Sequence, residues 1–281
     1  MDISLDYAAP DEDLREYLSV FYDFRVDLPY FEDMERADFA QIRFLLQGHG
    51  SYRFADGHVQ DSPAIAIVGP TTGNTQVRIH GPASLFGVGL LPAGWGALIG
   101  FEASTLVNRA LDATHLFGPA MAAATERLRA AATLEEKVTI GNELVRSMAA
   151  RTRDTPLAFT RIVDDWLASS LSPDVTELVE SLGLSRRQVE RQCNRLYGVP
   201  PKMLARKYRA LRAAITLARR ESNMDDLIGE SFYDQSHFIR EIKQFTGVTP
   251  KKFHDDLPML AKLTLKRAEL AGVVEPIIYQ T

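Results

Sequence analysis

The 281-residue sequence predicts an α+β protein, in which a β-rich N-terminal part precedes an all-α part. Three observations support this fold class. Short apolar or alternating runs, separated by Gly and Pro, fill residues 39–94 and are typical of strands. From residue 114 onward, apolar residues recur at helical spacing. Within this helical part, a unit that begins at Val175 is repeated from Met224 with similar residue types.

The N-terminal part is predicted to begin with a helix and to continue as a small barrel or sandwich. Residues 12–23 place Leu14, Tyr17, Leu18 and Phe21 on one helical face. Further on, Asp56-Gly57 is a hairpin signal. Five runs are expected to be strands: residues 42–46, 51–54, 64–68, 75–80 and 84–91. Several short strands punctuated by Gly and Pro predict a compact β fold.

Helices are predicted to follow the strands. Thr155-Pro156 marks a domain boundary, after which residues 157–168 form a helix. The C-terminal segment, residues 257–270, is predicted to form an amphipathic helix. Before the boundary, helices are expected at residues 95–99, 114–129 and 134–150. The last two form a pair that either packs on the β fold or provides a homodimer interface.

Each copy of the repeated unit predicts two helices joined by a tight turn, which is a helix-turn-helix. In the first copy, Gly183 breaks the chain before Ser185, a good N-cap that can form a capping box with Gln188. The second helix ends at Gly198, where a left-handed C-cap suits glycine. The apolar residues of the two helices have helical spacing: Val175, Leu178, Val179 and Leu182, then Val189, Cys193 and Leu196.

The second copy follows the same order. Asp234 is expected to cap its second helix, and Gly247 is expected to end it. A helix over residues 203–219 connects the copies and spans roughly 25 Å, since each of its residues rises by 1.5 Å. Such a spacer suits two second helices that lie about one DNA turn apart, roughly 34 Å. The expected buried residues are Phe238, Ile242 and Phe245.

The charge distribution indicates a nucleic-acid partner. The net charge is −5, but residues 1–150 carry −9 (11 Lys and Arg against 20 Asp and Glu) and residues 151–281 carry +4 (21 against 17). Between Ser185 and Arg220, eleven Lys and Arg residues are opposed only by Glu190. A solvated helix face normally mixes signs, whereas a run of one sign suits phosphate neutralisation. An acidic half joined to a basic half fits a sensor attached to a DNA reader.

Residues of both copies carry a resemblance to a known family. The second copy contains Asp234-Gln235-Ser236-His237-Phe238 with Arg240, then Phe245-Thr246-Gly247-Val248-Thr249-Pro250. The first copy contains Gly183-Leu184-Ser185, then Arg187-Gln188-Val189-Glu190-Arg191, with Gly198 and Pro201. Arg206, Arg209 and Ala213 fit the connecting helix. This part of the chain resembles the DNA-binding domain of the AraC/XylS family of bacterial transcription regulators.

The N-terminal layout, with Leu90-Leu91-Pro92-Ala93-Gly94-Trp95, resembles the cupin-like effector domain of such regulators. The resemblance implies an effector or dimerisation domain over residues 1–153 and a DNA-binding domain over 154–256, followed by a C-terminal extension over 257–281. Its recognition helices, about 186–197 and 235–246, would enter consecutive major grooves. The implied partners are promoter DNA, a small-molecule effector, RNA polymerase and a second copy of the chain.

DNA contacts are assigned from the second helix of each copy. Arg187 and Arg191 lie one turn apart, and arginine on guanine is the commonest specific base contact. Glu190, between them, can accept from cytosine. In the second copy, the matching base-reading residues are Gln235, Ser236, Ile239 and Arg240. The predicted phosphate contacts are Arg195, Lys202, Arg206, Lys207, His237, Lys243 and Lys251.

The second copy departs from the family pattern. It has Ile228-Gly229-Glu230-Ser231-Phe232 where the family usually has Ala-x-x-x-Gly-Phe, and it is one residue shorter than the family there. Cys193 and Ile242 stand where the family usually has Phe. We therefore expect the first copy to supply most of the DNA affinity.

No catalytic constellation is present, so the chain is not expected to be an enzyme. It lacks a Gly-rich phosphate loop and a Gly-x-Ser-x-Gly elbow. His49, His58 and His80 lack the spacing of metal-binding cupins, so neither a metal nor a cofactor is expected. Four aromatic residues either line an effector pocket or form barrel core: Tyr52, Phe54, Phe86 and Trp95.

The single cysteine, Cys193, excludes an intramolecular disulfide and suits a small core residue better than a redox sensor. Without a leader or a run of 18 apolar residues, the sequence predicts a cytoplasmic protein that does not span a membrane. Two rival interpretations remain open. One is a small-barrel enzyme that acts on a sugar or metabolite, and the other is a protein-interaction module whose helix-turn-helix has lost DNA affinity.

Overall fold

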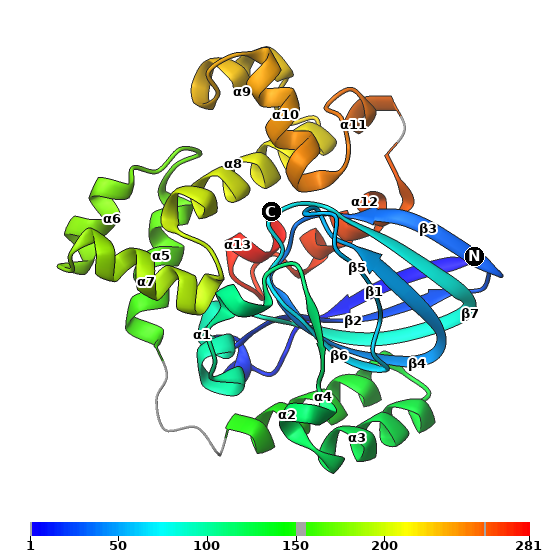
Figure 1. Cartoon of the computed structure of the whole chain (residues 1–281). Helices are drawn as coiled ribbons and strands as arrows, with labels where there is room; N and C mark the ends of the chain where they lie inside the picture. The colour runs from blue at the N-terminus through cyan, green and yellow to red at the C-terminus, as the bar shows by residue number, and fades with distance from the viewer. Residues whose placement is uncertain (1, 150–155, 256) are drawn as a thin grey trace.

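The computed structural model describes residues 2–149, 156–255 and 257–281, and it arranges them around a curved β-sheet with helices on two sides (Figure 1). All strand pairs in this sheet are antiparallel. The chain is therefore α+β, as the sequence predicts. The strands are β1 (Ile3–Ala8), β2 (Leu18–Val26), β3 (Tyr30–Glu35), β4 (Ala40–Arg53), β5 (Val59–Asp61), β6 (Ile65–Val68), β7 (Thr75–Leu90) and β8 (Ala110–Asp112).

Two long strands organise the sheet. β7 and β4 pair with each other along most of their length. One end of β7 pairs with β2 and the other with β3, while β4 pairs with β6 and β5 in the same way. The main strand order is β1-β2-β7-β4-β6-β8. Because each long strand serves two partners, the sheet curls and encloses an apolar interior, as the small barrel prediction requires.

The predicted helix over residues 12–23 is wrong. Only Glu12–Leu14 forms a short 3-10 helix (η1), and Leu18–Val26 is strand β2. β2 lies between β1 and β7, and both of its faces are covered, so all of its residues except Arg25 are buried. A strand that is buried on both faces shows no alternation, and its apolar residues can match a helical period by chance.

Other predicted strands exist but are longer than expected. Runs 42–46 and 51–54 belong to the single strand β4, which continues through irregular pairing near Gly48. Runs 75–80 and 84–91 likewise belong to β7. The predicted strand at 64–68 is confirmed as β6, and the Asp56-Gly57 turn joins β4 to β5. Strands β1, β3, β5 and β8 were not predicted.

A helical layer covers one side of the sheet, below it in Figure 1. The predicted helix over 114–129 is divided into α2 (Thr114–Phe117) and α3 (Pro119–Ala130), and α4 (Leu134–Ala149) follows. Apolar residues of α3 and α4 share a core with Phe21, Ile42 and Phe86 of the sheet. Inside this contact, the Lys137 ammonium pairs with the Asp23 carboxylate at 2.6 Å. The pair of helices therefore packs on the sheet, which was one of the two expected roles.

Before this layer, α1 (Pro92–Gly94) and the π-helix η2 (Trp95–Ile99) confirm the short helix, and the 3-10 helix η3 (Ala103–Leu106) follows. Beyond the boundary, the two repeated units and their connecting helix are confirmed. Of the boundary itself, Thr155 lies outside the described residues. The helices are α5 (Leu157–Ser169), α6 (Val175–Leu182), α7 (Arg186–Tyr197), α8 (Pro201–Ala218), α9 (Met224–Ser231), α10 (Gln235–Thr246) and α11 (Lys252–Asp255).

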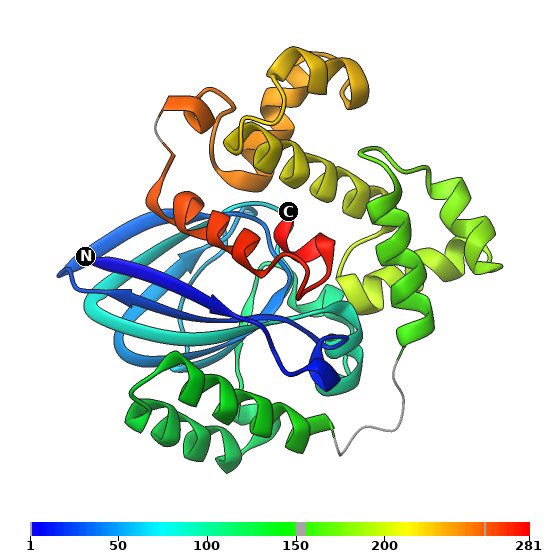
Figure 2. The same cartoon turned by 180° about the vertical axis from the view of Figure 1, so that it is seen from behind.

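The C-terminal segment is broken into three short helices instead of one. They are α12 (Met259–Thr264), the 3-10 helix η4 (Leu265–Leu270) and α13 (Pro276–Tyr279). Figure 2 shows this segment lying across the sheet, between the strands and the helical domain. Leu260 and Leu263 join the apolar interior of the sheet, whereas Ile278 joins the core of the first repeated unit. The extension thus packs on both domains.

Candidate DNA-binding surface and ligand pocket

The first reading helix, α7, is capped as predicted. The Ser185 hydroxyl accepts from the Gln188 N–H, and the Gln188 side chain accepts from the Ser185 N–H at 2.9 Å, which completes a capping box. Gly198 ends the helix with a φ of +80°. Val189, Cys193 and Leu196 are buried, so the opposite face is open to solvent. That face presents the predicted DNA contacts Arg187, Glu190, Arg191 and Arg195, all exposed.

The second reading helix, α10, has the same design. The Asp234 carboxylate accepts from the His237 N–H at 2.7 Å, and Phe238, Ile242 and Phe245 are fully buried. Three of its four predicted base-reading residues, Gln235, Ser236 and Arg240, are exposed. The fourth, Ile239, is half-buried against the apolar core of this unit. The exposed predicted phosphate contacts here are Lys243 and Lys251.

The turn before α10 differs chemically from the turn before α7. In the first unit, Gly183 takes a left-handed conformation, whereas Phe232 at the corresponding place is extended. Phe232 is buried, and its ring meets that of Phe238 edge-on at 4.8 Å. Both units still have helices of equal length, eight and then twelve residues. The altered turn therefore keeps the reading helix in place through an aromatic contact.

Several basic residues of the connecting helix α8 have structural partners. The Arg206 guanidinium donates to the Glu241 carboxylate at 2.5 Å, and Arg209 pairs with the same carboxylate at 3.3 Å. Arg212 donates to the Ser170 carbonyl oxygen at 2.7 Å. These contacts join α8 to α10 and to the end of α5. The expectation that Arg206 contacts phosphate is not supported, because its guanidinium is already paired with Glu241 within the domain.

Lys207 is the clearest correction to the predicted phosphate contacts. Its side chain is buried, and its ammonium donates to the Asp38 carbonyl oxygen at 2.7 Å, which joins α8 to the β domain. Burial lowers the pKa of Lys207 to about 8. Among the other predicted phosphate contacts, Lys202 is exposed, whereas His237 is half-buried beside Phe232 with its Nε2 3.9 Å from the Glu241 carboxylate.

The C-terminal ends of both reading helices dock on the β domain. A side chain at Gly198 would lie 2.7 Å from both Pro70 and Val107, so the backbone of α7 approaches this surface closely. At α10, the Asn74 side-chain amide donates to the Lys243 and Gln244 carbonyl oxygens at 3.1 and 3.0 Å. The Ala37 N–H donates to the Phe245 carbonyl oxygen at 2.7 Å. The free ends of α7 and α10 are therefore their N-terminal ends, which carry the base-reading residues.

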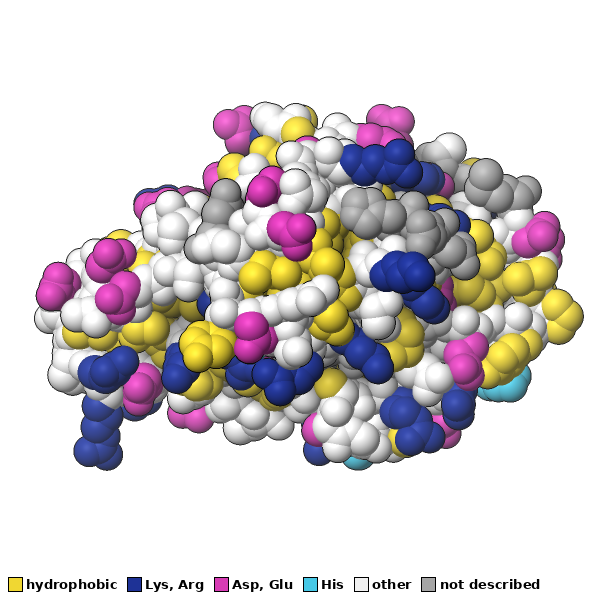
Figure 3. Space-filling view, turned by 90° about the horizontal axis from the view of Figure 1, so that it is seen from above, with side chains coloured by type: hydrophobic (Ala, Val, Ile, Leu, Met, Phe, Trp, Pro, Cys, Tyr) yellow, Lys and Arg dark blue, Asp and Glu magenta, His cyan; other side chains and the backbone are white. Residues whose placement is uncertain are grey.

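The surface charge agrees with this arrangement. Figure 3 shows Lys and Arg side chains projecting at the end of the molecule where α6 and α7 lie. Elsewhere on this face they form separate groups among apolar and acidic side chains. The continuous basic run in the sequence is thus divided by folding, since its members on α8 turn inward to Glu241 and Asp38.

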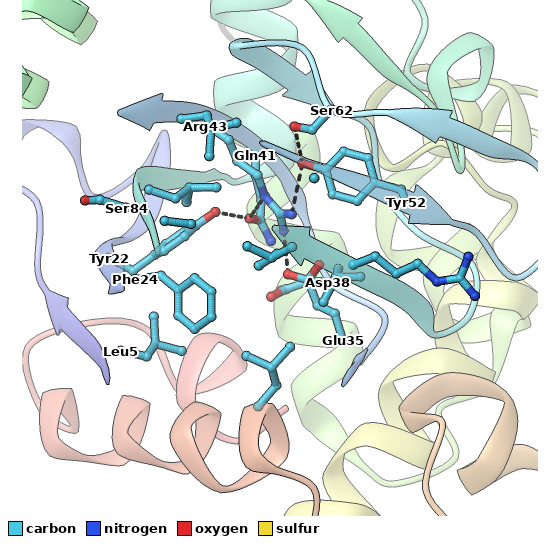
Figure 4. A pocket seen from close by; sticks show the side chains of 18 of the residues that line it. Leu5, Tyr22, Phe24, Glu35, Asp38, Gln41, Arg43, Tyr52, Ser62 and Ser84 are labelled. Atoms are coloured by element: carbon cyan, nitrogen blue, oxygen red, sulfur yellow. Dashed lines mark hydrogen bonds and ion pairs between the residues drawn. The ribbon is translucent and has the colours of Figure 1, made fainter. Parts of the chain in front are cut away.

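The interior of the β domain contains a pocket, drawn in Figure 4. A polar chain crosses one wall: the Tyr22 hydroxyl donates to the Gln41 side chain, which also accepts from Arg43 at 2.9 Å. Arg43 in turn pairs with Glu35. Burial raises the pKa of the Tyr22 hydroxyl, so it stays a neutral donor. The apolar part of the lining includes Leu5, Phe24, Val77, Leu85 and Leu260.

Only one of the four predicted pocket residues lines this cavity. Tyr52 does, and its hydroxyl lies 3.0 Å from the Ser62 hydroxyl. Phe54 is buried behind Tyr52 beside a much smaller cavity. Phe86 and Trp95 are fully buried in the core between the sheet and the α3–α4 layer, so their predicted pocket role is wrong. Strand alternation explains this, because Phe86 points to the face of the sheet opposite Leu85.

Sequence reasoning missed the charged end of this pocket. Arg36, Asp38 and Arg267 all line it, and Arg267 pairs with the Asp38 carboxylate at 2.6 Å. The two arginines beside Asp38 hold the pKa of its carboxyl well below its usual range, against the opposing effect of burial. Asp38 and Arg267 are 229 positions apart, so no local pattern could have brought them together.

The remaining expectations concern the single cysteine, metal ligands and membrane-spanning helices. Cys193 is buried, and burial raises the pKa of its thiol to about 12, as suits a core residue. Within the described ranges, no three His, Cys, Asp or Glu side chains come together in a way that would hold a metal ion. None of the helices described has the length and apolar character needed to cross a bilayer. The His49 and His80 rings stack across neighbouring strands at 4.6 Å.

Comparison with known proteins gives two family matches. Residues 178–256 match a family model described as a helix-turn-helix domain, and residues 7–112 match a domain model of unknown function. No curated protein sequence matches the chain.

Solved structures with overall similarity include two of ToxT from Vibrio cholerae. ToxT of strain SCE256, solved with an unsaturated fatty acid bound, shares 11 % identity over 91 % of this chain and 96 % of that chain, with a TM-score of 0.43. ToxT of strain O395 shares 8 % identity over 80 % and 96 % of the two chains, with a TM-score of 0.42. The AraC-like transcriptional activator CuxR shares 16 % identity over 74 % of this chain and 86 % of that chain, with a TM-score of 0.31.

The family match covers both repeated units, and it agrees with the geometry of those units. Each unit has a capped reading helix. One face of this helix packs its apolar residues into the core, and the opposite, exposed face has polar and basic residues. Helix α8 joins them, as the resemblance in the sequence implies. Residues 178–256 therefore form a helix-turn-helix domain of the AraC type, the kind of domain found in DNA-binding transcription regulators.

Proposed function

We propose that this regulator binds promoter DNA by inserting the N-terminal halves of α7 and α10 into consecutive major grooves. The observation that supports this most directly is the position of the candidate contacts. Arg187, Glu190 and Arg191 on α7 and Gln235, Ser236 and Arg240 on α10 are exposed at the ends of the helices that do not dock on the β domain. Exposed arginine and amide side chains on a reading helix are suited to base edges.

The phosphate contacts in this proposal are fewer than the sequence indicates. Arg195, Lys202, Lys243 and Lys251 are exposed and remain candidates, and His237 is half-buried. Arg206 and Lys207 are removed from this role, because they pair with Glu241 and Asp38. Since each released counterion steepens the salt dependence of binding, the smaller set predicts a shallower dependence than the basic run alone suggests.

The finer parts of the proposal concern control and organisation. A small molecule in the β-domain pocket acts as the effector. The functional units are residues 1–153, 154–256 and 257–281.

The regulator acts in the cytoplasm, and it contacts RNA polymerase when bound at a promoter. Self-association uses the outer face of the α3–α4 pair. One chain carries both reading helices, so DNA reading does not itself require a second copy.

The test of DNA reading is the change of Arg191 to Ala. Footprinting on the DNA upstream of the protein's own gene locates the site, and titration at fixed salt measures affinity. Losing a bidentate guanine contact should weaken specific binding by about 1–3 kcal/mol and relax the base preference at one position. Arg53→Ala is the matched control, because Arg53 is an exposed arginine on β4. Equal losses of specific DNA affinity in the two variants would contradict the proposed role of Arg191 as a base contact. No loss of affinity in Arg191→Ala would contradict it as well.

A further inference from the structure

The C-terminal extension forms one wall of the β-domain pocket. Leu260, Thr264 and Arg267 line the cavity from α12 and η4. The extension is anchored there by the Leu260 N–H, which donates to the Asp33 carboxylate at 2.8 Å, and by the Arg267–Asp38 ion pair. Leu260 and Leu263 also belong to the same apolar cluster as Phe24 and Phe31. A ligand in this pocket therefore contacts the extension directly.

The charged end of the pocket carries more positive than negative charge. Arg36 and Arg267 flank the carboxylate of Asp38, Lys207 lies behind it on the Asp38 carbonyl oxygen, and Arg43 is matched by Glu35. Four cations against two carboxylates leave a net charge of about +2 in a buried region. Uncompensated buried charge is costly, so an added anion would be stabilised here. The other pair at the pocket, Arg78 with Glu32, is balanced and partly exposed.

Two guanidinium groups at this end have unused donors. The Nε and Nη2 atoms of Arg36 and the Nε atom of Arg267 are buried without a hydrogen-bond partner. The side chain of Arg267 is only 8 % exposed, and that of Arg36 is 11 % exposed. Arg36 approaches the Asp38 carboxylate only to 3.8 Å. Buried donors normally have partners, so these positions are suited to acceptor oxygens from a bound molecule.

The rest of the pocket limits the size and character of that molecule. Its free volume is about 90 Å³, so the bound molecule must be compact. Leu5, Phe24, Val77 and Leu85 make the remainder of the wall apolar. A small carboxylate with a compact apolar body meets both requirements, and butanoate and benzoate are suitable probes of this class.

We propose that the pocket binds a compact monocarboxylate, with its carboxylate on Arg36 and Arg267, and that the C-terminal extension responds to it. The ligand shares Arg267 with Asp38. The backbone carbonyl of Asp38 holds Lys207 of α8, so a change at Asp38 reaches the connecting helix of the DNA-binding domain. This inference names the ligand class and the contact path for the effector control proposed above, and it rests on that proposal only for its consequence at DNA.

The test measures ligand binding by the full chain without DNA, so that its result does not depend on the proposed DNA contacts. Calorimetric titrations use butanoate, benzoate, 1-butanol and inorganic phosphate. We expect each carboxylate to bind at least tenfold more tightly than the alcohol or phosphate. Equal binding of butanoate and 1-butanol would overturn the charge argument. Tighter binding of phosphate, or no binding of either carboxylate, would overturn the ligand class.

Variants then test the role of the extension. Arg267→Lys keeps the charge but removes the planar donor pair, and it should weaken benzoate binding about tenfold. Lys262→Met is the matched control, because Lys262 is exposed on α12, does not line the pocket, and should leave binding unchanged. Benzoate should also slow hydrogen exchange over residues 259–270 of the parent chain. Unchanged binding in Arg267→Lys or unchanged exchange in the parent would each refute the role of the extension, and the exchange measurement holds even if the variant does not fold.

Discussion

Asp164 on α5 lies among packed helices, and its environment opposes ionisation. Its carboxylate accepts from the Tyr197 hydroxyl at 2.9 Å, while burial, with Asp165 and Glu275 nearby, raises its pKa to about 7. An acid with a raised pKa in the folded state favours folding while it is protonated. The contribution of Asp164 to the free energy of unfolding is therefore complete below the ordinary pKa of aspartate. It disappears as the pH rises through about 7.

The change of Asp164 to Asn should remove this pH dependence. Above pH 7 the variant should have a higher free energy of unfolding than the parent, and the difference should shrink towards zero or reverse near pH 4. Urea unfolding at pH 4, 6 and 8 measures it. Asp61→Asn is a suitable control, because Asp61 is exposed on β5 and does not contribute to the environment of Asp164. A parent-to-variant difference that does not vary with pH would show that Asp164 is not the titrating group.

Single residues also show where sequence reasoning succeeds. The caps at Ser185 and Asp234 and the helix ends at Gly198 and Gly247 are confirmed, because these signals act between neighbours in the chain. The partners of Lys207 and Arg206 could not be foreseen. A basic residue in a basic run has the same local sequence whether it contacts phosphate or a distant carboxylate.

At the scale of elements, the helix-turn-helix units were predictable and the sheet was only partly so. Helical periodicity survives in α6, α7, α9 and α10 because each has one buried and one open face. β2 shows no alternation of apolar and polar residues, because both of its faces are covered. The pocket depends on α12 meeting β3, which are far apart in the chain, so no short pattern predicts it.

Helix α9 offers a prediction about the second unit. Gly229 lies in the helix interior, is exposed, and has open space where a side chain would be. Gly229→Ala should stabilise α9 by about 0.5–1 kcal/mol, since alanine favours helix. Hydrogen exchange of the α9 amides should then slow by roughly two- to fivefold.

The matched variant is Gly183→Ala at the end of α6. Gly183 also has open space, but its φ is +61°. Alanine at this position should therefore destabilise the end of α6 by about 1 kcal/mol. If both variants changed the stability of their helices in the same direction, backbone conformation would not govern the effect of alanine at either position.

At the scale of the whole molecule, the β domain holds both reading helices by their C-terminal ends. Asn74 supplies two of the hydrogen bonds at α10, and removing its side chain leaves only its backbone contact with Gln244. Asn74→Ala should therefore loosen this docking by about 1 kcal/mol. The Ala37 N–H, which donates to the Phe245 carbonyl, should exchange roughly fivefold faster.

Residue-resolved exchange by NMR measures this effect. Gln60→Ala removes hydrogen bonds to Ala110 within the β domain and should leave the Ala37 exchange rate unchanged. An unchanged Ala37 rate in Asn74→Ala would show that the side chain does not hold α10 in place.

The two close approaches, at Gly198 and at Gly247, occupy the same position in the two repeats. Both glycines face the β domain, with Pro70 and Val107 on one side and Met34 and Asn74 on the other. With both helices attached to one rigid sheet, neither can turn to follow a half-site that is displaced around the duplex. One inserted base pair moves a half-site by about 3.4 Å and about 34° in helical phase. The docked regulator should therefore reject a promoter of altered spacing more strongly than Asn74→Ala does, and competition between promoters that differ by one base pair measures this tolerance.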